Sequence, residues 1–522
     1  MTSRQPKNQD YPNVASANNG RDETKNGYAA LSPSKKKTSL EIIEPQTFSS
    51  PKKTAEITET LQSNEKEIVS PPAIESLKTA DETEDLSFAE KRKLDRKNKK
   101  LRKAESVLSR DNWLARNGHA ATYFFLYLFS AFVFFRPYEW LPQLSFLQVG
   151  AFVLALLTLL VYLPAQFSTE GSLTILTTEV KSVLCLVGLA LLTMPISKNP
   201  ALSWQTFNDT FIKAVVMFIV MVNVLRTRRR LMGIMWISFG ISLVLSYIAI
   251  GMYMRGELKA EGYRVEVDFG GMLGNPNDMA LHLVTMTPLV ICLGIATKNS
   301  LLRLVYFTMA VLFVAASVVT FSRGAFLGLL VVGAMLVWKI GRKQRFNAIV
   351  ASIVVGGLFI LLAPGNYGMR LLSIFVPGLD AVGSSDQRRE LLQQSIQVTL
   401  RNPWGIGIGC FPEVSQHNLQ THNAFTQVSS ELGILGLAAY LIFMVSPVRK
   451  LAAIERTLFE NGKTDWYYYL AIGLQASIAG FMVSSFFGPV AYNWFVYYLV
   501  AYAVAFRRIY QIEKGDDLKN TK

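Results

Sequence analysis

Residues 301–340, LLRLVYFTMAVLFVAASVVTFSRGAFLGLLVVGAMLVWKI, decide the class of this protein. The stretch holds two apolar runs, 301–320 and 324–340, which are separated only by a short junction around Arg323. An α-helix rises about 1.5 Å per residue, so about 20 apolar residues cross the roughly 30 Å hydrocarbon core of a bilayer. Each run therefore predicts a membrane-spanning helix, and the chain reverses direction at an arginine.

Similar apolar runs extend from this pair towards both ends of the chain. Half of the 522 residues are hydrophobic, which is a high share for a soluble protein. The pattern predicts an all-α polytopic membrane protein with about 12 transmembrane helices. We expect these helices near residues 119–135, 146–164, 182–196, 210–225, 231–252, 279–297, 301–320, 324–340, 346–363, 424–447, 466–487 and 490–507.

Residues 1–110 differ from this membrane domain, which we place at 119–510. They are polar and have few aromatic side chains, so they cannot bury enough apolar surface to offset the entropy of ordering. We predict a disordered, basic cytoplasmic tail without a cleavable signal peptide. Within it, residues 86–110 carry apolar side chains at roughly seven-residue spacing among many lysines and arginines. This segment is either a basic amphipathic helix on anionic lipid or a solvated helix that only enforces topology.

Basic residues fall on alternate predicted loops. They cluster at 226–230, 298–303, 339–345, 449–450 and 507–508. Because Lys and Arg concentrate on the cytoplasmic side, this pattern predicts that these loops and both termini are cytoplasmic. A large polar loop between helices 9 and 10, residues 364–423, then lies outside the cytoplasm. No basic cluster is interleaved with base-stacking aromatic residues, so nucleic-acid binding is not expected.

The polar residues on the predicted outer side are few. The large loop contains Arg388, Arg389, a Gly-Ile-Gly-Ile-Gly run at 405–409, and His422. Arg323 lies between two apolar spans, where a charge is costly and usually has an anionic partner or a watery cavity; the alternative is an arginine that snorkels to lipid headgroups.

A preceding outer loop ends in Asn-Pro-Asn-Asp, residues 275–278. Proline is favoured at the first position of a helix, so Pro276 is expected to begin the next span, with Asn277 or Asp278 as its cap. Three cysteines at positions 185, 292 and 410 give neither a disulfide framework nor a metal-ligand spacing. No nucleotide-binding motif is present, and we expect no metal and no cofactor.

The order of these motifs resembles that of the O-antigen ligase and polymerase family of bacterial envelope enzymes. The sequence has Asn-Pro-Asn at a helix entry, 275–277, and Ser-Arg-Gly-Ala between two spans, 322–325. A large outer loop follows, with an amphipathic helix that starts at an arginine, an Asn-Pro turn rich in glycine at 402–409, and His-Asn before the next span. The resemblance covers residues from about Phe239 to Val448.

This resemblance implies a fold like the C-class membrane glycosyltransferases and an enzyme of the bacterial inner membrane. Such enzymes transfer an oligosaccharide or polysaccharide from a polyprenyl-diphosphate carrier to a hydroxyl of lipid A core or of another glycan, without a metal. The family's paired arginines map to Arg323 and Arg388, and its histidine maps to His422. Five further residues are expected to bind substrate: Arg389, which replaces Arg388 if the register differs by one, Arg264, Asn275, Asn277 and Asn423. The sequence departs from the family pattern at Leu392, where an aromatic residue is frequent, and in its basic tail.

The chemistry of these side chains agrees with that role. Arginine binds phosphate oxygens bidentately and stays charged in a dry site, so Arg323 and Arg388 would stabilise a leaving diphosphate. Histidine titrates near neutral pH and would accept the proton of the attacking hydroxyl, a role that we assign to His422. Among the other histidines, His417 is expected to be solvated, and His282 either faces a cavity or packs within a span. His119 is expected at the membrane interface.

Two other classes of function remain as alternatives. A transporter or flippase for an anionic lipid or sugar would use similar arginines, but it should show repeated halves, which the sequence lacks. A non-catalytic scaffold would leave Arg323 between apolar spans without a reason. Within the transferase class, ligase and polymerase use the same donor and differ in their acceptor, so the sequence leaves both open.

Overall fold

The computed structural model describes residues 119–140, 142–260, 264–267, 273–343, 346, 350, 384–416 and 418–520. These residues form helices joined by loops and contain no β-strand, only an isolated bridge between Ala260 and Arg264. Nine helical segments in these ranges are long and apolar enough to cross a bilayer. The prediction of an all-α polytopic membrane protein is therefore confirmed. The predicted tail 1–110, most of the predicted span 346–363, and His417 lie outside the described residues.

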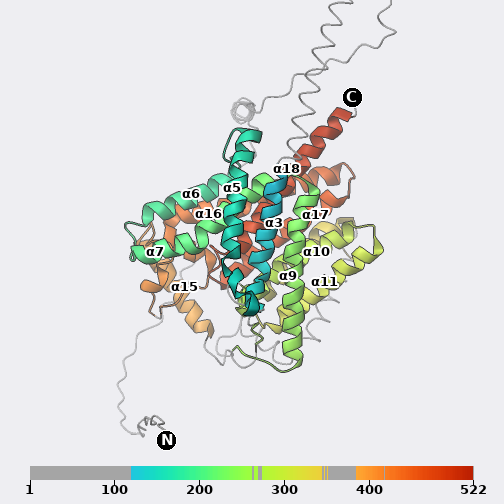
Figure 1. The fold of residues 1–522 in the computed structure, drawn as a ribbon. Helices are drawn as coiled ribbons and strands as arrows, with labels where there is room; N and C mark the ends of the chain where they lie inside the picture. The colour runs from blue at the N-terminus through green and yellow to red at the C-terminus, as the bar shows by residue number, and fades with distance from the viewer. Residues whose placement is uncertain are drawn as a thin grey trace, which may run out of the picture. The chain divides into compact units, whose positions relative to one another are not determined.

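The predicted spans within the described residues each coincide with a helix (Figure 1). The helical elements are α3 (Ala120–Phe135), α4 (Pro137–Trp140), η2 (Pro142–Val149), α5 (Gly150–Glu170), α6 (Thr178–Thr193), α7 (Pro200–Thr206), η3 (Phe207–Phe211), α8 (Ile212–Val224), α9 (Arg228–Met254), α10 (Pro276–Ala296), α11 (Ser300–Val319), α12 (Arg323–Ile340), η5 (Gly341–Lys343), α15 (Ser384–Arg401), η6 (Phe411–Glu413), α16 (Ala424–Glu460), α17 (Trp466–Ser484), η7 (Ser485–Phe487) and α18 (Trp494–Asn520).

Residues 197–209, which separate the predicted spans 182–196 and 210–225 and were expected to form an outer loop, are largely helical instead. Asn199 accepts a hydrogen bond from the backbone N–H of Leu202 and caps α7, and Pro200 occupies its first turn. From there α7, the π-helical turn η3 and α8 continue as one apolar segment, Pro200–Val224. The polar residues of 197–209 therefore begin a span, because an N-cap followed by proline starts a helix even in a polar context.

Helix α10 forms the centre of the molecule. It packs against α9, α11, α12 and α17, and 83% of its most apolar window is buried. The corresponding share of α5 is 11%, and α5 exposes Phe152, Leu156 and Leu160 along one side. A helix that is apolar all round fits the centre of a bundle, whereas exposed apolar side chains at this spacing fit contact with lipid. The residues at the start of α10 are therefore positioned by the most buried part of the fold.

Side-chain caps fix where the central helices begin. Asn275 accepts a hydrogen bond from the backbone N–H of Asn277 at 2.8 Å and caps α10. The expectation that Asn277 or Asp278 forms this cap is wrong, whereas Pro276 begins the helix as predicted. The earlier cap follows from the position of the proline, since the N-cap directly precedes the first helical residue.

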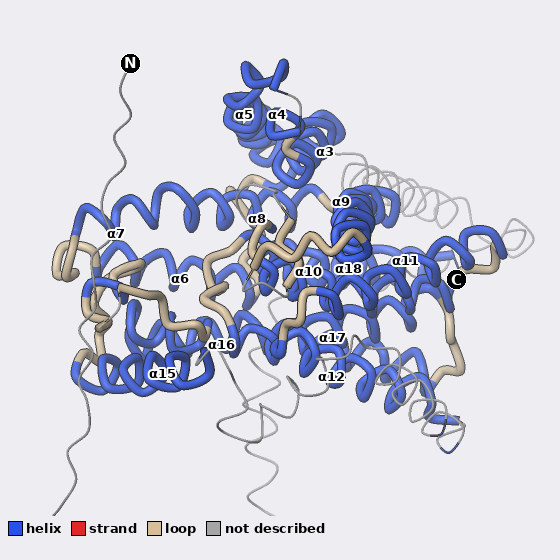
Figure 2. Tube along the Cα trace, turned by 90° about the horizontal axis from the view of Figure 1, so that it is seen from below, coloured by secondary structure: helices blue, strands red, loops and turns tan. Residues whose placement is uncertain are grey.

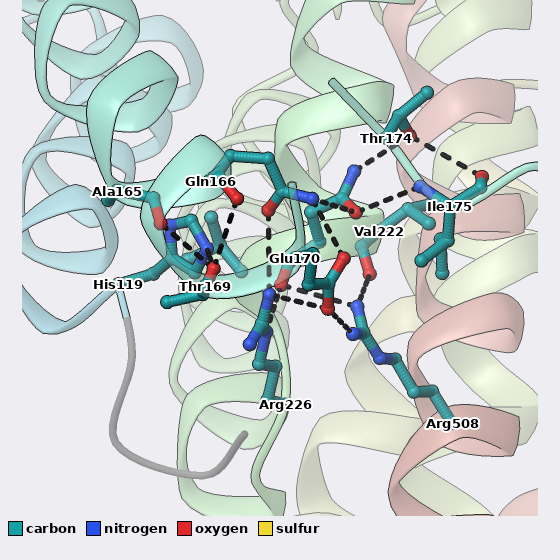
Figure 3. A network of polar contacts seen from close by, with 12 residues as sticks. His119, Ala165, Gln166, Thr169, Glu170, Thr174, Ile175, Val222, Arg226 and Arg508 are labelled. Atoms are coloured by element: carbon teal, nitrogen blue, oxygen red, sulfur yellow. Dashed lines mark hydrogen bonds and ion pairs between the residues drawn. The ribbon is translucent and has the colours of Figure 1, made fainter. Parts of the chain in front are cut away.

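A network of charged and amide side chains joins α5, the junction between α8 and α9, and α18 (Figure 3). The carboxylate of Glu170 accepts from Arg226 at 2.8 Å and also from Arg508. Gln166 donates to Glu170 at 2.8 Å, and Asn223 donates to Thr174 at 2.9 Å. The contacts connect residues that are up to 338 positions apart in the sequence, so the network fastens the first helices of the domain to the last.

Two further glutamates bind basic side chains in the same way. Glu179 of α6 contacts Lys450 at 3.0 Å and Arg507 at 3.4 Å. Glu455 of α16 contacts Lys339 at 2.7 Å and Arg342 at 2.9 Å. The basic residues that the sequence marks as topology signals are thus also structural partners of buried carboxylates.

Candidate functional site

Helix α15 presents Arg388 on its inner face. Leu391 and Ser395 of the same face are fully buried, and Thr399 bonds with Ser429 of α16 at 2.9 Å between hydroxyl oxygens. Residues three to four positions apart share a helix face, so Arg388 points to the same side. Arg388 is partly buried, whereas Arg389 is exposed. This placement fits Arg388 to the predicted role better than Arg389. The helix begins at Ser384 and not at the arginine.

His422 lies between α15 and the start of α16. Its backbone has a φ of 51°, in the left-handed region that a non-glycine residue adopts at a cost. The next residue, Asn423, caps α16 by accepting hydrogen bonds from the backbone N–H groups of Phe425 and Thr426. Burial, and then the positive charge of Arg388, lower the pKa of His422 below its ordinary value. Arg388 therefore lies near enough to His422 to act on it electrostatically, and both causes favour the neutral imidazole.

The glycine run binds to a break in α16. At Gly433 the helix has a φ of 75° and a ψ of −175°, so the carbonyl groups before it lose their helical donors. Instead, the carbonyl of Ser430 accepts from Ile406 at 3.0 Å, and that of Glu431 accepts from Gly407 at 2.9 Å (Figure 2, where α15 lies beside α16). A Cβ on Gly407 would lie 2.2 Å from Ser197, so only glycine allows this approach. These two N–H groups hold α16 and are not free to bind an anion.

Glu431 also anchors this turn through its side chain. Its carboxylate accepts a hydrogen bond from the backbone N–H of Gly409 at 2.8 Å, and the side chain is completely buried. The turn is held from the other side by Ser203, whose hydroxyl donates to the carbonyl of Ile408 at 3.0 Å and lies 3.1 Å from the sulfur of Cys410. Sequence analysis did not select Glu431, although a carboxylate among apolar residues at the start of a predicted span is a signal for a buried role.

A second group of predicted residues lies where α10 and α12 begin. The guanidinium of Arg264 donates to the carbonyl of Thr320 at 2.8 Å and to the side-chain oxygen of Asn277 at 2.7 Å. Arg323 is the first residue of α12 and is 7% exposed. Arg264 therefore ties the two helix starts together beside Arg323. In this structure Asn275 and Asn423 use their side-chain oxygens as caps, so their predicted contact with substrate stays a prediction.

The two groups are connected through aromatic residues that the sequence analysis did not select. Phe486 packs on Phe425 with ring centroids 4.6 Å apart. Phe487 packs so closely on Gly324 that a Cβ there would lie 2.8 Å from the Cβ of Phe487. Residues 484–490 thus lie between the start of α12 and the start of α16. They showed no signal in the sequence because Phe486 and Phe487 form the apolar end of the predicted span 466–487.

A comparison with known families covers this part of the chain. Residues 308–441 match the family model described as O-antigen ligase. This stretch is similar to the O-antigen ligase family. The matched O-antigen ligase region includes Arg323, Arg388 and His422, whereas Arg264, Asn275 and Asn277 precede it. No curated protein matches the chain.

The match agrees with the resemblance recognised in the sequence and is centred on the same elements. It runs from within α11 through α12 and α15 to the first part of α16, which are the elements that hold the catalytic candidates. Among the residues that the structure describes, no three His, Cys, Asp or Glu side chains come together as metal ligands.

Proposed function

We propose that this chain transfers a glycan from a polyprenyl-diphosphate carrier to an acceptor hydroxyl at the outer face of the membrane. The match of residues 308–441 to the O-antigen ligase family supports an envelope glycan function of the ligase or polymerase type. The observation that carries the proposal is the pairing of Arg388 with His422. Burial lowers the pKa of the His422 imidazole, and Arg388 lies near enough for its charge to lower this pKa further. A cation and a neutral imidazole are the two groups that such a transfer needs.

In the proposed reaction the oxygen of the acceptor hydroxyl attacks the anomeric carbon of the donor sugar. The bond from this carbon to the diphosphate breaks, and its electron pair remains on the leaving oxygen. Arg388 and Arg323 stabilise that charge, because fixed guanidinium groups bind phosphate oxygens bidentately and need no reorganisation during the reaction. His422 accepts the proton of the hydroxyl. The proposal requires no metal.

The proposal places both termini in the cytoplasm of a bacterial inner membrane and the loop 364–423 outside. It is supported by the clustering of Lys and Arg in alternate loops. Reporter fusions test this orientation. A green fluorescent protein fused after Arg230 should fluoresce, and an alkaline phosphatase fused after Asn402 should be active. The reverse result at both positions contradicts the orientation and, with it, the outer active site.

The activity is tested with the purified full-length protein, a fluorescent glycan on polyprenyl diphosphate, and an acceptor glycan or lipid A core. We expect transfer that persists in excess chelator. Failure of transfer with every acceptor, in protein that binds the donor, would contradict the proposed reaction. The acceptor class follows from a deletion strain: accumulation of long carrier-linked chains indicates a ligase, and surface glycans capped with a single unit indicate a polymerase.

A further inference from the structure

A small pocket lies beside Arg323 and is lined by polar side chains together with apolar ones. It is formed where α10 and α12 begin and α17 ends. Its polar side chains belong to Asn277, Asp278, Ser322 and Ser484, and Phe487 forms part of its wall. None of the residues that line it was assigned a role in the proton transfer or in binding the diphosphate, except Asn277 as a predicted substrate contact. The pocket therefore raises a separate question about what it binds.

The carboxyl group of Asp278 is the acidic group among the residues that line this pocket. Among the residues that the structure describes, no side chain or backbone N–H donates a hydrogen bond to it, and no basic side chain pairs with it. The side chain is partly buried and forms part of the pocket wall. A partly buried carboxylate without a donor is unfavourable, because its lone pairs lose water without gaining a partner. A ligand that donates a hydrogen bond here would restore what the folded chain lacks.

The neighbouring side chains narrow the chemistry of that ligand. The side-chain oxygen of Asn277 accepts from Arg264, which leaves its amide NH₂ to donate. The hydroxyl of Ser322 accepts from the N–H of Ala325 and keeps its own hydrogen to donate. Ser484 donates to the carbonyl of Gly324 and keeps lone pairs to accept. The pocket thus offers both donors and acceptors, which suits hydroxyl groups.

Charge separates this pocket from the arginines. A carboxylate repels a diphosphate, whereas Arg323 and Arg388 attract it. The two regions are nevertheless adjacent, since Ser322 immediately precedes Arg323 and Arg264 binds both Asn277 and the chain before Ser322. A glycan donor has the same arrangement, because its first sugar is bonded directly to its diphosphate. A neutral, hydroxyl-rich group beside an anionic one matches a carboxylate pocket beside an arginine.

We propose that this pocket receives a sugar hydroxyl, from which Asp278 accepts a hydrogen bond. The inference rests on the proposed transfer function and adds to it the place and the partner of a sugar. The hydroxyl belongs either to the first sugar of the donor or to the acceptor glycan, since both present the same chemistry. In either case Asp278 binds substrate, and it takes no part in binding the diphosphate.

The test compares the wild type with Asp278→Asn, which keeps the size of the side chain, and with Asp278→Ala. Asp209→Asn is the control, since Asp209 is an exposed carboxylate near Lys213 and does not line the pocket. Three quantities are measured on the full chain in detergent: the affinity for sugar-free polyprenyl diphosphate, the affinity for the glycan-linked carrier, and the KM for the acceptor. Thermal melting of each variant checks that it is folded.

We expect both Asp278 variants to bind sugar-free polyprenyl diphosphate as the wild type does. A hydrogen bond to a charged group corresponds to a loss of roughly 10- to 100-fold in affinity when it is removed. A loss of this size in affinity for the glycan-linked carrier assigns the pocket to the donor sugar, and a rise of this size in the acceptor KM assigns it to the acceptor. Asp209→Asn should change neither quantity.

Two results would overturn the inference. If folded Asp278→Asn and Asp278→Ala keep both the affinity for the glycan-linked carrier and the acceptor KM of the wild type, no sugar uses this carboxylate. If both variants lose affinity for sugar-free polyprenyl diphosphate as well, Asp278 supports the arginines instead. Failure of the proposed function looks different, because the wild type itself would then bind neither form of the carrier.

Discussion

The glutamate network of Figure 3 and the candidate site are both polar regions within an apolar molecule, yet they are built differently. In the network, long side chains from distant helices meet, as Arg226 and Arg508 do on Glu170. At the site, two left-handed backbone conformations stand directly before helices that carry candidate residues, whereas the network has one such residue, His119, at its edge. Phe321 before α12 has a φ of 52°, and His422 before α16 has a φ of 51°. Side-chain pairs of the first kind fasten helices together, whereas strained backbone of the second kind typically occurs where function requires it.

The comparison predicts that the two regions fail in different ways. Substitutions in the network should lower stability and leave the activity of the folded protein intact. Substitutions at the site should do the reverse.

The largest expected effect concerns His422. Replacing it with Gln or Ala should slow transfer by roughly 100- to 10,000-fold, because the attacking hydroxyl loses its base. Donor binding and thermal melting should remain as in the wild type. Transfer rates with a fluorescent donor measure the effect, and His417→Ala serves as the control because that side chain is expected to be solvated. If the His417 variant is inactive and the His422 variant is active, the assignment of His422 as the base is wrong.

The next effect is on stability. Glu170→Ala removes the carboxylate that both Arg226 and Arg508 contact, and Arg226 is only 2% exposed. Removing one partner of a buried pair costs about 3 kcal/mol or more, because the remaining charge stays buried. Thermal and denaturant unfolding in detergent should show the loss, while transfer per folded molecule stays constant. The matched control is Glu460→Ala, which breaks the exposed pair with Arg456 and should have little measurable effect.

A smaller effect is expected when Arg323 or Arg388 is replaced by lysine, which keeps the positive charge but lacks the planar guanidinium group. Arg323→Lys and Arg388→Lys remove the planar fork that binds two phosphate oxygens, so affinity for the donor should fall by roughly 10- to 100-fold. Binding of polyprenyl diphosphate measures this directly. Arg401→Lys is the control, since Arg401 is exposed at the far end of α15. Donor affinity equal to that of the wild type in both arginine variants would exclude them from the site.

The smallest effect is a shift in pH dependence. Because burial and Arg388 lower the pKa of His422 below 6.5, the neutral imidazole persists into mildly acidic solution and is lost only as the pH falls through this lowered value. Transfer by the wild type should therefore decline on the acid side below pH 6.5. In Arg388→Gln one positive charge is gone, so the pKa of His422 should rise and the acid limb of residual activity should move to higher pH. An unchanged limb would show that a different group is the base.

The sequence predicts features that depend on neighbouring residues, and it does not predict contacts between residues that are far apart in the chain. The spans follow from apolar runs of sufficient length, and the start of α10 follows from Pro276, because these signals are local. The order of Arg323, the loop helix and His422 is likewise a local pattern along the chain. The partners of Glu170 could not be predicted, since nothing near it in the sequence indicates a contact with Arg508, 338 residues away.

The break in α16 was missed for a similar reason. Residues 424–447 read as one continuous apolar helix, and Gly433 by itself is tolerated within a helix. The break is stable only because Ile406 and Gly407 supply the hydrogen bonds that the helix loses. The role of residues 484–490 could not be predicted, because it depends on the contacts of Phe486 with Phe425 and of Phe487 with Gly324. These contacts join residues that are distant in the sequence.

Cys410 has a practical consequence for following this loop. Its sulfur is fully buried in the turn that holds α16, against the hydroxyl of Ser203. Maleimides react with a thiolate that water reaches, so this thiol should be modified only while the turn is open. Cys292 is buried as well, and Cys185 is exposed on an apolar helix where water-soluble reagents are excluded in a bilayer. The rate of alkylation of the native protein in lipid therefore measures how often the loop opens. A slower rate in the presence of donor would show that donor binding keeps the loop closed, and no cysteine would have to be introduced for this measurement.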